Sequence, residues 1–331
     1  MPSNRKVVMV PRTMGEAGQA VLSRRDDIEL RQYSTALKQA ELLEALGDVA
    51  GIALSVTPFG KAEMDAAPAM QVVARIGVGY DAVDVPALTA RRVPLMIAGT
   101  SNSTSVAEHA LYLIMTLAKR GPAMDKVVRE GRWTEGRRES LPAELAGKAV
   151  LVVGFGRIGT RLAKRCAAMD MRVLVYDPYV PAEAIRAAGH EPAADLDAAL
   201  PEADFVTIHC PKTPETVGLF DAPRLARMRR GAAIVNTARG GIIDEPALFN
   251  ALTTGHLSGA GLDVFETEPA PVDIALLSLE QVIASPHMAG VTTESVAGMA
   301  VATAENILSV LDGRPNRDNV VNKEVLGQSA L

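Results

Sequence analysis

The chain has 331 residues, of which 48% are hydrophobic and 22% charged, and its formal net charge is −5. This length accommodates two domains of ordinary size, and the composition is typical of a soluble globular protein. No basic arm or Lys/Arg block is present, which argues against nucleic-acid binding. The two cysteines, Cys166 and Cys210, are too few for a disulfide framework and lack the spacing of zinc ligands.

The N-terminal sequence MPSNRKVVMV has too short an apolar run for a signal peptide, and no stretch approaches 18 apolar residues. We therefore expect a cytoplasmic protein that does not span a membrane and holds no metal.

The N-terminal third alternates between strand and helix patterns. Lys6–Val10, Gly51–Val56 and Gln71–Arg75 predict strands, and Ser34–Leu46 has the apolar period of a helix that ends at Gly47. Such alternation is typical of βαβ units and a parallel sheet, so residues 7–97 predict a small α/β unit.

Residues 103–120 predict a helix with an apolar face. Ser105 and Glu108 have the spacing of a capping box at its start, and Gly121-Pro122 predicts its end. A polar, irregular segment follows over Glu130–Pro142.

The rest of the chain predicts six further strands, at 149–153, 173–176, 205–209, 232–236, 259–264 and 282–285. Six strands with intervening helices are typical of the doubly wound dinucleotide fold. An amphipathic helix over 292–311 comes next, and Val320-Val321 predicts a terminal strand or a tail.

The sequence AVLVVGFGRIG at 149–159 carries the most specific local motif. Gly154 makes a tight turn, Gly156 lets the backbone approach a pyrophosphate, and Gly159 lets helix pack on strand. The pyrophosphate would lie on the helix N-terminus, and Asp177, after the next strand, can accept hydrogen bonds from the ribose hydroxyls. The motif therefore predicts dinucleotide binding.

The position of this motif predicts a discontinuous domain. A dinucleotide domain needs roughly 150–190 residues, so we expect it to span 103–291, starting with the helix before the motif. The remaining segments, 1–102 and 292–331, would form a substrate domain. Two chain crossings, near 102 and 292, predict a hinge and a substrate cleft between the domains.

Three later strand ends carry candidate catalytic residues. Arg239, flanked by glycine, is suited to a carboxylate, Glu268 lies in GLDVFETEP, and His287 follows Ser-Pro on a fixed corner. We expect structural roles for the other histidines. His190 and His256 would lie in exposed turns, and His109 and His209 would be packed residues.

Six motifs stand out along the chain: RIGVGYDAVD at 75–84, SVAEHALYL at 105–113, GFGRIG at 154–159, NTARGGIIDE at 236–245, GLDVFETEP at 261–269 and SPHMAG at 285–290. With these motifs the sequence resembles the D-isomer-specific 2-hydroxyacid dehydrogenase family over nearly its whole length. The resemblance implies an α/β fold of two doubly wound parallel sheets, with a Rossmann NAD domain inserted into a flavodoxin-like substrate domain.

The resemblance also implies the residue roles. Arg239 would bind the substrate carboxylate, His287 would be the acid and base, and Glu268 would orient His287. The backbone of Val78 and Gly79 would add substrate contacts. The expected cofactor contacts are Ser103, Gly154, Gly156, Arg157, Ile158, Gly159, Asp177, Cys210, Pro211, Thr237, Asp263, His287, Met288, Ala289 and Gly290. Asp177 repels a 2′-phosphate, so we expect NAD rather than NADP.

The expected substrate is a small unphosphorylated 2-oxo or 2-hydroxy acid such as glyoxylate or hydroxypyruvate. The sequence ends at 331, without the regulatory extension of many phosphoglycerate dehydrogenases, and Leu54–Phe59 replaces a segment that often carries arginine. D-3-phosphoglycerate dehydrogenase remains an alternative, as does an NAD(H)-sensing regulator. Glu268 argues against formate dehydrogenase.

The resemblance further implies a homodimer formed through residues 103–148. Trp133, the only tryptophan, lies in this arm. It would either anchor the dimer contact or reach the neighbouring subunit's active site.

Overall fold

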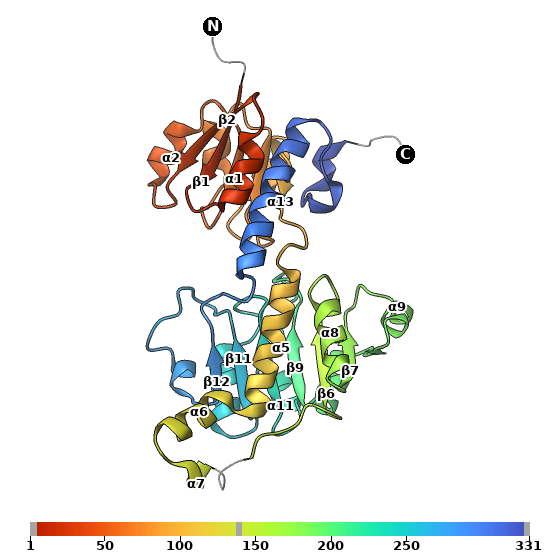
Figure 1. Cartoon of the computed structure of the whole chain (residues 1–331). Coiled ribbons are helices and arrows are strands. Elements are labelled where there is room, and N and C mark those ends of the chain that lie inside the picture. The colour runs from red at the N-terminus through yellow and green to blue at the C-terminus, as the bar shows by residue number, and fades with distance from the viewer. Residues whose placement is uncertain (1–4, 137–140, 328–331) are drawn as a thin grey trace. The chain divides into compact units, whose positions relative to one another are not determined.

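The computed structural model describes residues 5–136 and 141–327. The chain divides into two compact units, one formed by Met1–Asn102 with Val291–Leu331 and the other by Ser103–Gly290. Each unit holds its own parallel sheet (Figure 1). The fold is therefore α/β with two doubly wound sheets, as the sequence predicts.

The first unit contains a five-stranded sheet in the order β2-β1-β3-β4-β5. This is the flavodoxin-like order. Its strands are β1 (Lys6–Pro11), β2 (Ile28–Tyr33), β3 (Val49–Leu54), β4 (Val72–Arg75) and β5 (Leu95–Met96). The three predicted strands are present, and β2 and β5 are additional.

Helices cover both faces of this sheet. They are α1 (Glu16–Ser23), α2 (Gln39–Ala45), α3 (Lys61–Ala66), α4 (Val85–Ala90) and α13 (Thr293–Leu311). The helix α13 lies beside α1 (Figure 1), and its Ile307 is buried in one core cluster with Val8 and Val72. A Cβ on Gly18 would lie 2.4 Å from the Ala300 carbonyl oxygen, so this glycine permits the close approach of the two helices.

The helix predicted over Ser34–Leu46 is shorter than expected. The helix α2 begins at Gln39 because the backbone N–H of Lys38 donates to Glu41 Oε2 (3.0 Å), which caps the helix start. The preceding Ser34 turns the chain instead, since its Oγ accepts from Ala36 N at 3.2 Å.

The second unit contains a seven-stranded sheet in the order β12-β11-β10-β9-β6-β7-β8. Its strands are β6 (Ala149–Val153), β7 (Arg172–Tyr176), β8 (Glu191–Pro192), β9 (Phe205–Ile208), β10 (Ala233–Asn236), β11 (Gly259–Leu262) and β12 (Val282–Ala284). Counted from β6, the order 3-2-1-4-5-6 is that of the Rossmann fold, with β12 added at one edge. The six predicted strands are confirmed, and β8 is additional.

Two layers of helices enclose this sheet. The helices of this unit are α5 (Ser103–Lys119), α6 (Gly121–Arg129), α7 (Trp133–Gly136), α8 (Gly159–Ala168), α9 (Ala182–Ala187), α10 (Leu196–Ala199), α11 (Ala222–Arg227) and α12 (Glu245–Thr253). The helix α5 lies beside α8 (Figure 1) and buries Leu113 and Ile114 in one cluster with Val150. Leu225 of α11 and Leu248 of α12 belong to the other cluster.

The helix predicted over 103–120 is confirmed as α5, Ser103–Lys119, but the capping box predicted at its start is wrong. Ser105 is a helical residue, and Glu108 pairs with Arg165 at 2.9 Å. After Lys119 the chain turns at Arg120, which has a φ of 54°, and α6 starts at once with a proline in its first turn. The segment predicted as irregular over Glu130–Pro142 contains α7, and its residues 137–140 lie outside the described residues.

The segment around Val320-Val321 extends the first sheet. Val320 forms an antiparallel bridge with Met96, and Val321 N donates to Leu95 O at 2.9 Å. Within residues 5–136 and 141–327, no helix has the length and apolarity needed to cross a membrane.

Candidate functional site

The predicted site residues of the second unit follow its parallel strands. Parallel strands place their carboxyl ends at one edge, where open α/β sheets bind ligands. Gly154 follows β6, Asp177 follows β7, Cys210 follows β9, Thr237 and Arg239 follow β10, Asp263 and Glu268 follow β11, and His287 follows β12. One edge of one sheet therefore collects these residues.

The three glycines of the loop after β6 have different surroundings. A Cβ on Gly154, whose φ is 99°, would lie 2.7 Å from Cys210 N, and one on Gly159 would lie 2.0 Å from Gly154 O. A Cβ on Gly156 would meet nothing within 4 Å. The chain's own packing thus requires Gly154 and Gly159, whereas Gly156 faces open space of the kind a pyrophosphate needs. No side chain caps the N-terminus of α8, so its first N–H groups suit an anion.

Asp177 is fixed beside this loop by two backbone N–H groups. Its Oδ2 accepts from Phe155 N at 2.7 Å, and its Oδ1 accepts from Tyr179 N at 2.9 Å. Each carboxylate oxygen keeps further acceptor capacity. The half-buried carboxylate is therefore oriented to accept hydroxyl groups of a ribose.

Cys210 and Thr237 supply a small, weakly polar lining at neighbouring strand ends. Burial raises the pKa of the Cys210 thiol to about 11, so it is a neutral side chain at pH 7. The Thr237 Oγ1 is buried and has no hydrogen-bond partner among the described residues. A buried hydroxyl without a protein partner is unusual and fits contact with a bound polar group. Together with the glycine loop, these residues fit a dinucleotide.

The turn that carries Arg239 is shaped by Asn236, a residue that the sequence did not single out. Asn236 is buried at the end of β10; its Oδ1 accepts from Ala238 N (3.0 Å) and its Nδ2 donates to Arg239 O (2.8 Å). One terminal nitrogen of Arg239 also donates to Ala238 O at 2.6 Å. Amide side chains that bond their own backbone favour turns, so asparagine in this position is the signal that could have been used.

Gly240 brings this turn against the segment that leads to Glu268. A Cβ on Gly240 would lie 1.7 Å from Phe265 O and 2.6 Å from Glu266 N. Any side chain at this position would push the β10 and β11 turns apart. The sequence identified Gly240 only as a glycine flanking Arg239, and its packing role becomes visible in the structure.

Glu268 and His287 form a hydrogen-bonded pair. His287 Nδ1 lies 2.7 Å from Glu268 Oε2, while Glu268 Oε1 accepts from Phe265 N at 3.1 Å. The side chains of His287 and Glu268 are 49% and 36% exposed, so the pair is accessible to a substrate. With Nδ1 on the carboxylate, Nε2 is the ring nitrogen left for proton transfer.

Asp263 supports the segment that carries His287. The Asp263 side chain is 1% exposed, and its Oδ1 accepts from Ser285 Oγ (2.6 Å) and Met288 N (2.8 Å). Its Oδ2 accepts from Ala289 N at 2.9 Å. Both carboxylate oxygens are therefore engaged within the protein. Contact between Asp263 and a cofactor stays a prediction, as it does for Met288, Ala289 and Gly290.

The remaining predicted cofactor residues of the second unit lie at helix starts or in the loops after strands. Ser103 is the first residue of α5 and is buried, and Ile158 is the N-cap of α8. Arg157 precedes it in the glycine loop and is exposed, and Pro211 follows Cys210. All of them belong to Ser103–Gly290.

Val78 and Gly79 belong to the first unit, in the loop after β4. Gly77 has a φ of 135°, which favours glycine. Arg75 braces this loop, because its Nε donates to Gly79 O at 2.8 Å and one terminal nitrogen donates to Leu54 O at 3.3 Å. The sequence did not single out Arg75. The loop thus presents braced, half-buried backbone at the carboxyl edge of the first sheet.

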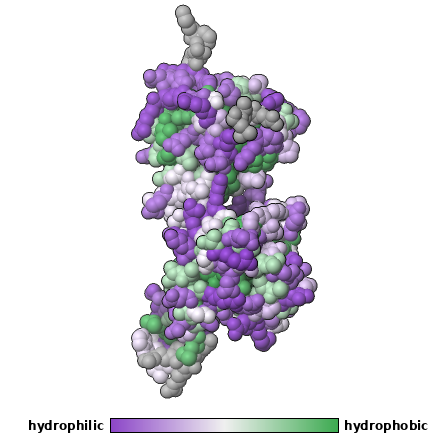
Figure 2. Space-filling model, turned by 90° about the vertical axis from the view of Figure 1, so that its right-hand side faces the viewer, coloured by the Kyte–Doolittle hydropathy of each residue, from purple (hydrophilic) through white to green (hydrophobic). Residues whose placement is uncertain are grey.

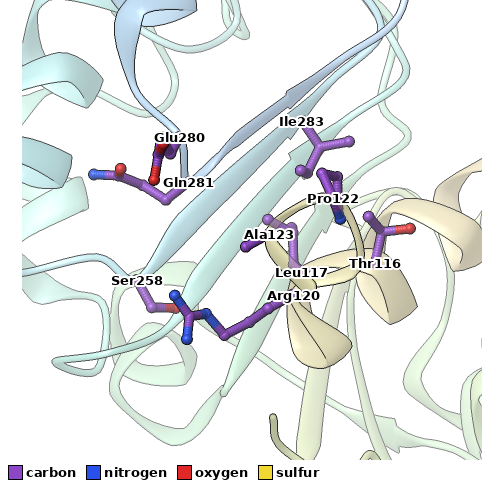
Figure 3. A pocket seen from close by; sticks show the side chains of 9 residues that line it. All are labelled: Thr116, Leu117, Arg120, Pro122, Ala123, Ser258, Glu280, Gln281 and Ile283. Atoms are coloured by element: carbon purple, nitrogen blue, oxygen red, sulfur yellow. The ribbon is translucent and has the colours of Figure 1, made fainter. Parts of the chain in front are cut away.

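A separate cavity of about 160 Å³ lies at the opposite edge of the second sheet (Figure 3). Ser258 and Gln281 line it, and they precede β11 and β12 rather than follow them. None of the predicted site residues lines this cavity.

Comparisons with known proteins identify the family to which this chain belongs. Residues 111–289 match the family model described as D-isomer specific 2-hydroxyacid dehydrogenase, NAD binding domain. Over 308 residues the chain is 42% identical to a D-3-phosphoglycerate dehydrogenase of Mycobacterium tuberculosis, covering 91% of this chain and 57% of that protein. The chain thus spans little more than half the length of this curated relative.

Two solved structures are similar over almost their full length. The TT0316 protein from Thermus thermophilus superposes with a TM-score of 0.83 at 34% identity, covering 95% of this chain and 99% of that one. A glyoxylate reductase from Paecilomyes thermophila superposes with a TM-score of 0.86 at 25% identity, covering 98% and 100%. The chain therefore belongs to the D-isomer specific 2-hydroxyacid dehydrogenase family and carries its NAD-binding domain.

Proposed function

We propose that this protein is an NAD-dependent dehydrogenase that interconverts a small D-2-hydroxy acid and its 2-oxo acid. The observation that carries the proposal is the 2.7 Å contact between His287 Nδ1 and Glu268 Oε2 at a half-exposed strand end. A carboxylate on one ring nitrogen fixes the imidazole orientation and leaves the other nitrogen to exchange a proton with substrate.

The two compact units divide the work in this proposal. Ser103–Gly290 binds the dinucleotide through the glycine loop and Asp177. The unit formed by the two ends of the chain binds the acid, with the backbone N–H groups of Val78 and Gly79 directed at its carboxylate. The braced loop after β4 supports this assignment, because a fixed backbone concavity binds anions well.

Arg239 binds the substrate carboxylate and polarises the neighbouring carbonyl. Its planar guanidinium can form two parallel hydrogen bonds with a carboxylate, and the Asn236 turn holds its backbone. A positive charge at this position also stabilises the negative charge that develops on the C2 oxygen during reduction.

His287 exchanges the proton at the C2 oxygen. Bound NAD supplies the donor or acceptor for the hydride at C2. In reduction, protonated His287 donates a proton from Nε2 to the forming alkoxide, and in oxidation neutral His287 accepts the hydroxyl proton. Glu268 holds the ring through Nδ1 and balances the positive charge of the imidazolium.

The loop after β3 favours an unphosphorylated acid. Residues 55–59, Ser-Val-Thr-Pro-Phe, contain no cation, and Val56 is 74% exposed. A phosphate is usually bound by arginine, lysine or clustered N–H groups. The competing candidate is D-3-phosphoglycerate, because curated relatives 37–42% identical to this chain are named D-3-phosphoglycerate dehydrogenase.

A substrate panel tests these alternatives. NADH oxidation is measured with glyoxylate, hydroxypyruvate and 3-phosphohydroxypyruvate, and NAD reduction with the matching D-hydroxy acids. The proposal expects the highest kcat/KM with an unphosphorylated acid. A preference for the phosphorylated acid would replace the proposed substrate, while absence of turnover in both directions would favour the NAD(H)-sensing regulator.

We also infer that α5–α7 form a contact with a second copy of this chain. Figure 2 shows hydrophobic side chains at the lower end of the second unit, where α6 and α7 lie. Tyr112, Val128, Trp133 and Leu141 are each more than half exposed. Such a concentration of exposed apolar side chains is typical of an interface.

Sedimentation of the parent protein and of the Val128→Lys variant tests this inference. We expect a dimer for the parent and a monomer for the variant. A parent that is monomeric at micromolar concentration would contradict the inference.

A further inference from the structure

We propose that His109, on α5, positions His287 for catalysis through Ser285 and Asp263. This inference rests on the proposed function, since it assigns His109 a task only if His287 exchanges the substrate proton. His109 does not touch the reacting atoms in this scheme and is a positioning residue.

The contact chain begins on the helix and ends at the backbone around His287. His109 Nε2 lies 2.9 Å from Ser285 Oγ, and Ser285 Oγ lies 2.6 Å from Asp263 Oδ1. The Asp263 carboxylate accepts the N–H groups of Met288 and Ala289, at 2.8 and 2.9 Å. The Asp263 carbonyl accepts the N–H of His287 itself, also at 2.8 Å. One buried aspartate thus fixes three consecutive backbone N–H groups.

The direction of these hydrogen bonds follows from the groups involved. An ionised carboxylate only accepts, so the single Ser285 hydroxyl proton is donated to Asp263. The Ser285 oxygen must then accept from His109, which therefore carries a proton on Nε2. A neutral His109 with the proton on Nε2 satisfies the whole chain, and no charge on it is required.

The segment needs this support because His287 has an unfavourable backbone conformation. Its φ is 54°, in the left-handed region that non-glycine residues rarely adopt. A residue held there is strained and persists only when its surroundings fix it. Loosening Asp263 would let the segment relax and move Nε2 of His287 away from the substrate oxygen.

His109 is a better candidate for this task than for simple packing. Its side chain is 21% exposed, although the sequence predicted a packed residue. Its ring also lies 5.5 Å from the ring of Tyr112, a contact that an aromatic hydrocarbon could keep. Two substitutions therefore separate the hydrogen bond from the packing: His109→Phe keeps an aromatic ring without a donor, and His109→Gln keeps an N–H donor without the ring.

The test compares kcat and KM for the 2-oxo acid at saturating NADH. For His109→Phe we expect kcat to fall about tenfold, as is usual when a supporting hydrogen bond is lost, with KM within twofold of the parent. His109→Gln should recover most of the lost kcat. Hydrogen exchange measured without NADH should show faster exchange of the Met288 and Ala289 amides in His109→Phe, at an unchanged melting temperature.

A double-mutant cycle with Ser285→Ala provides the second measurement. If His109 acts through Ser285, the double variant His109→Phe/Ser285→Ala should lose no more activity than Ser285→Ala alone. Equal kcat in His109→Phe and the parent, or equal losses in the Phe and Gln variants, would overturn the proposal. The proposal would also be overturned if the losses of kcat in the two single variants multiplied in the double variant. Failure of the proposed function has a different signature, because His287→Gln would then retain turnover.

Discussion

The carboxyl edges of the two sheets present different groups, mainly side chains at one edge and mainly backbone at the other. At the edge of the seven-stranded sheet, Asn236, Asp263 and Glu268 use their side chains to hold the neighbouring turns. At the edge of the five-stranded sheet, the loop after β4 offers mainly backbone, braced by Arg75. Side chains that carry charge and protons can do chemistry, whereas braced backbone can only bind and select.

This difference separates the effects expected from substitutions in the two units. Changes at the edge of the second unit should lower kcat, because the proposed function places the proton donor and the carboxylate-binding group there. Changes at the edge of the first unit should raise KM and leave kcat nearly intact, because they affect interactions shared by the bound and reacting acid.

The largest effect is expected for His287→Gln. Removing the acid and base should lower kcat by about 10²–10⁴-fold, while the Kd for NADH changes little. Steady-state kinetics and NADH fluorescence titration check both quantities. His256→Gln, in the turn before β11 at the opposite sheet edge, is the matched control and should behave like the parent.

Arg239→Lys should have the next largest effect. Lysine keeps the charge but loses the paired hydrogen bonds to a carboxylate, so kcat/KM for the 2-oxo acid should fall by about 10–10²-fold. The Arg239→Lys variant should keep the melting temperature of the parent, because Asn236 bonds the backbone of residues 238 and 239 and not the Arg239 side chain. An unchanged kcat/KM would show that Arg239 does not bind the substrate.

Glu268→Gln should lower kcat. The substitution removes the negative charge 2.7 Å from His287 Nδ1, which in the proposed function orients the ring and balances the charge of the imidazolium. We expect kcat for 2-oxo acid reduction to fall about tenfold with KM nearly unchanged, as measured by steady-state kinetics. An unchanged kcat would contradict the pairing.

Asp177→Asn should narrow the preference for NADH over NADPH. The amide no longer repels a 2′-phosphate, and its oxygen can still accept from Phe155 N. We expect the ratio of kcat/KM values for the two cofactors to fall about tenfold, which corresponds to about 1.4 kcal/mol. A ratio that stays constant would mean that Asp177 does not face the ribose.

The smallest effect is expected in the first unit, for Arg75→Met. Losing the donors to Gly79 O and Leu54 O should loosen the loop and raise KM about threefold, with kcat nearly unchanged. Arg91→Met is the control, because Arg91 also donates to a backbone carbonyl, Met64 O, but away from this loop. If kcat fell in Arg75→Met and not in Arg91→Met, the proposed division of roles between the two units would be contradicted.

The sequence predicts the strands and the glycine loop well because both depend on local patterns. Buried parallel strands appear as short β-branched runs, and Gly159 is required by a contact with Gly154 in the same loop. Helix capping was less predictable. Ser105 and Glu108 have the spacing of a capping box, but Ser105 lies inside α5 and Glu108 pairs with Arg165 on α8.

The sequence indicates candidate site residues, but it does not indicate the hydrogen bonds and contacts that hold them in place. Asn236 bonds the turn that directly follows it, so its local signal was present but not used. Gly240 packs against Phe265 and Glu266, which the fold brings near, so no local pattern marks it. For the same reason His109 was predicted as a packed residue, although its partner Ser285 is 176 positions further along the chain.

The most direct test of the central claim is the single-turnover rate of NADH oxidation in the parent and His287→Gln. Enzyme in excess over NADH, at saturating 2-oxo acid, separates the reacting step from product release. We expect the single-turnover rate to be lower by about 10²–10⁴-fold in His287→Gln, with NADH binding retained. Equal single-turnover rates in the two proteins would contradict the assignment of chemistry to the carboxyl edge of the second sheet.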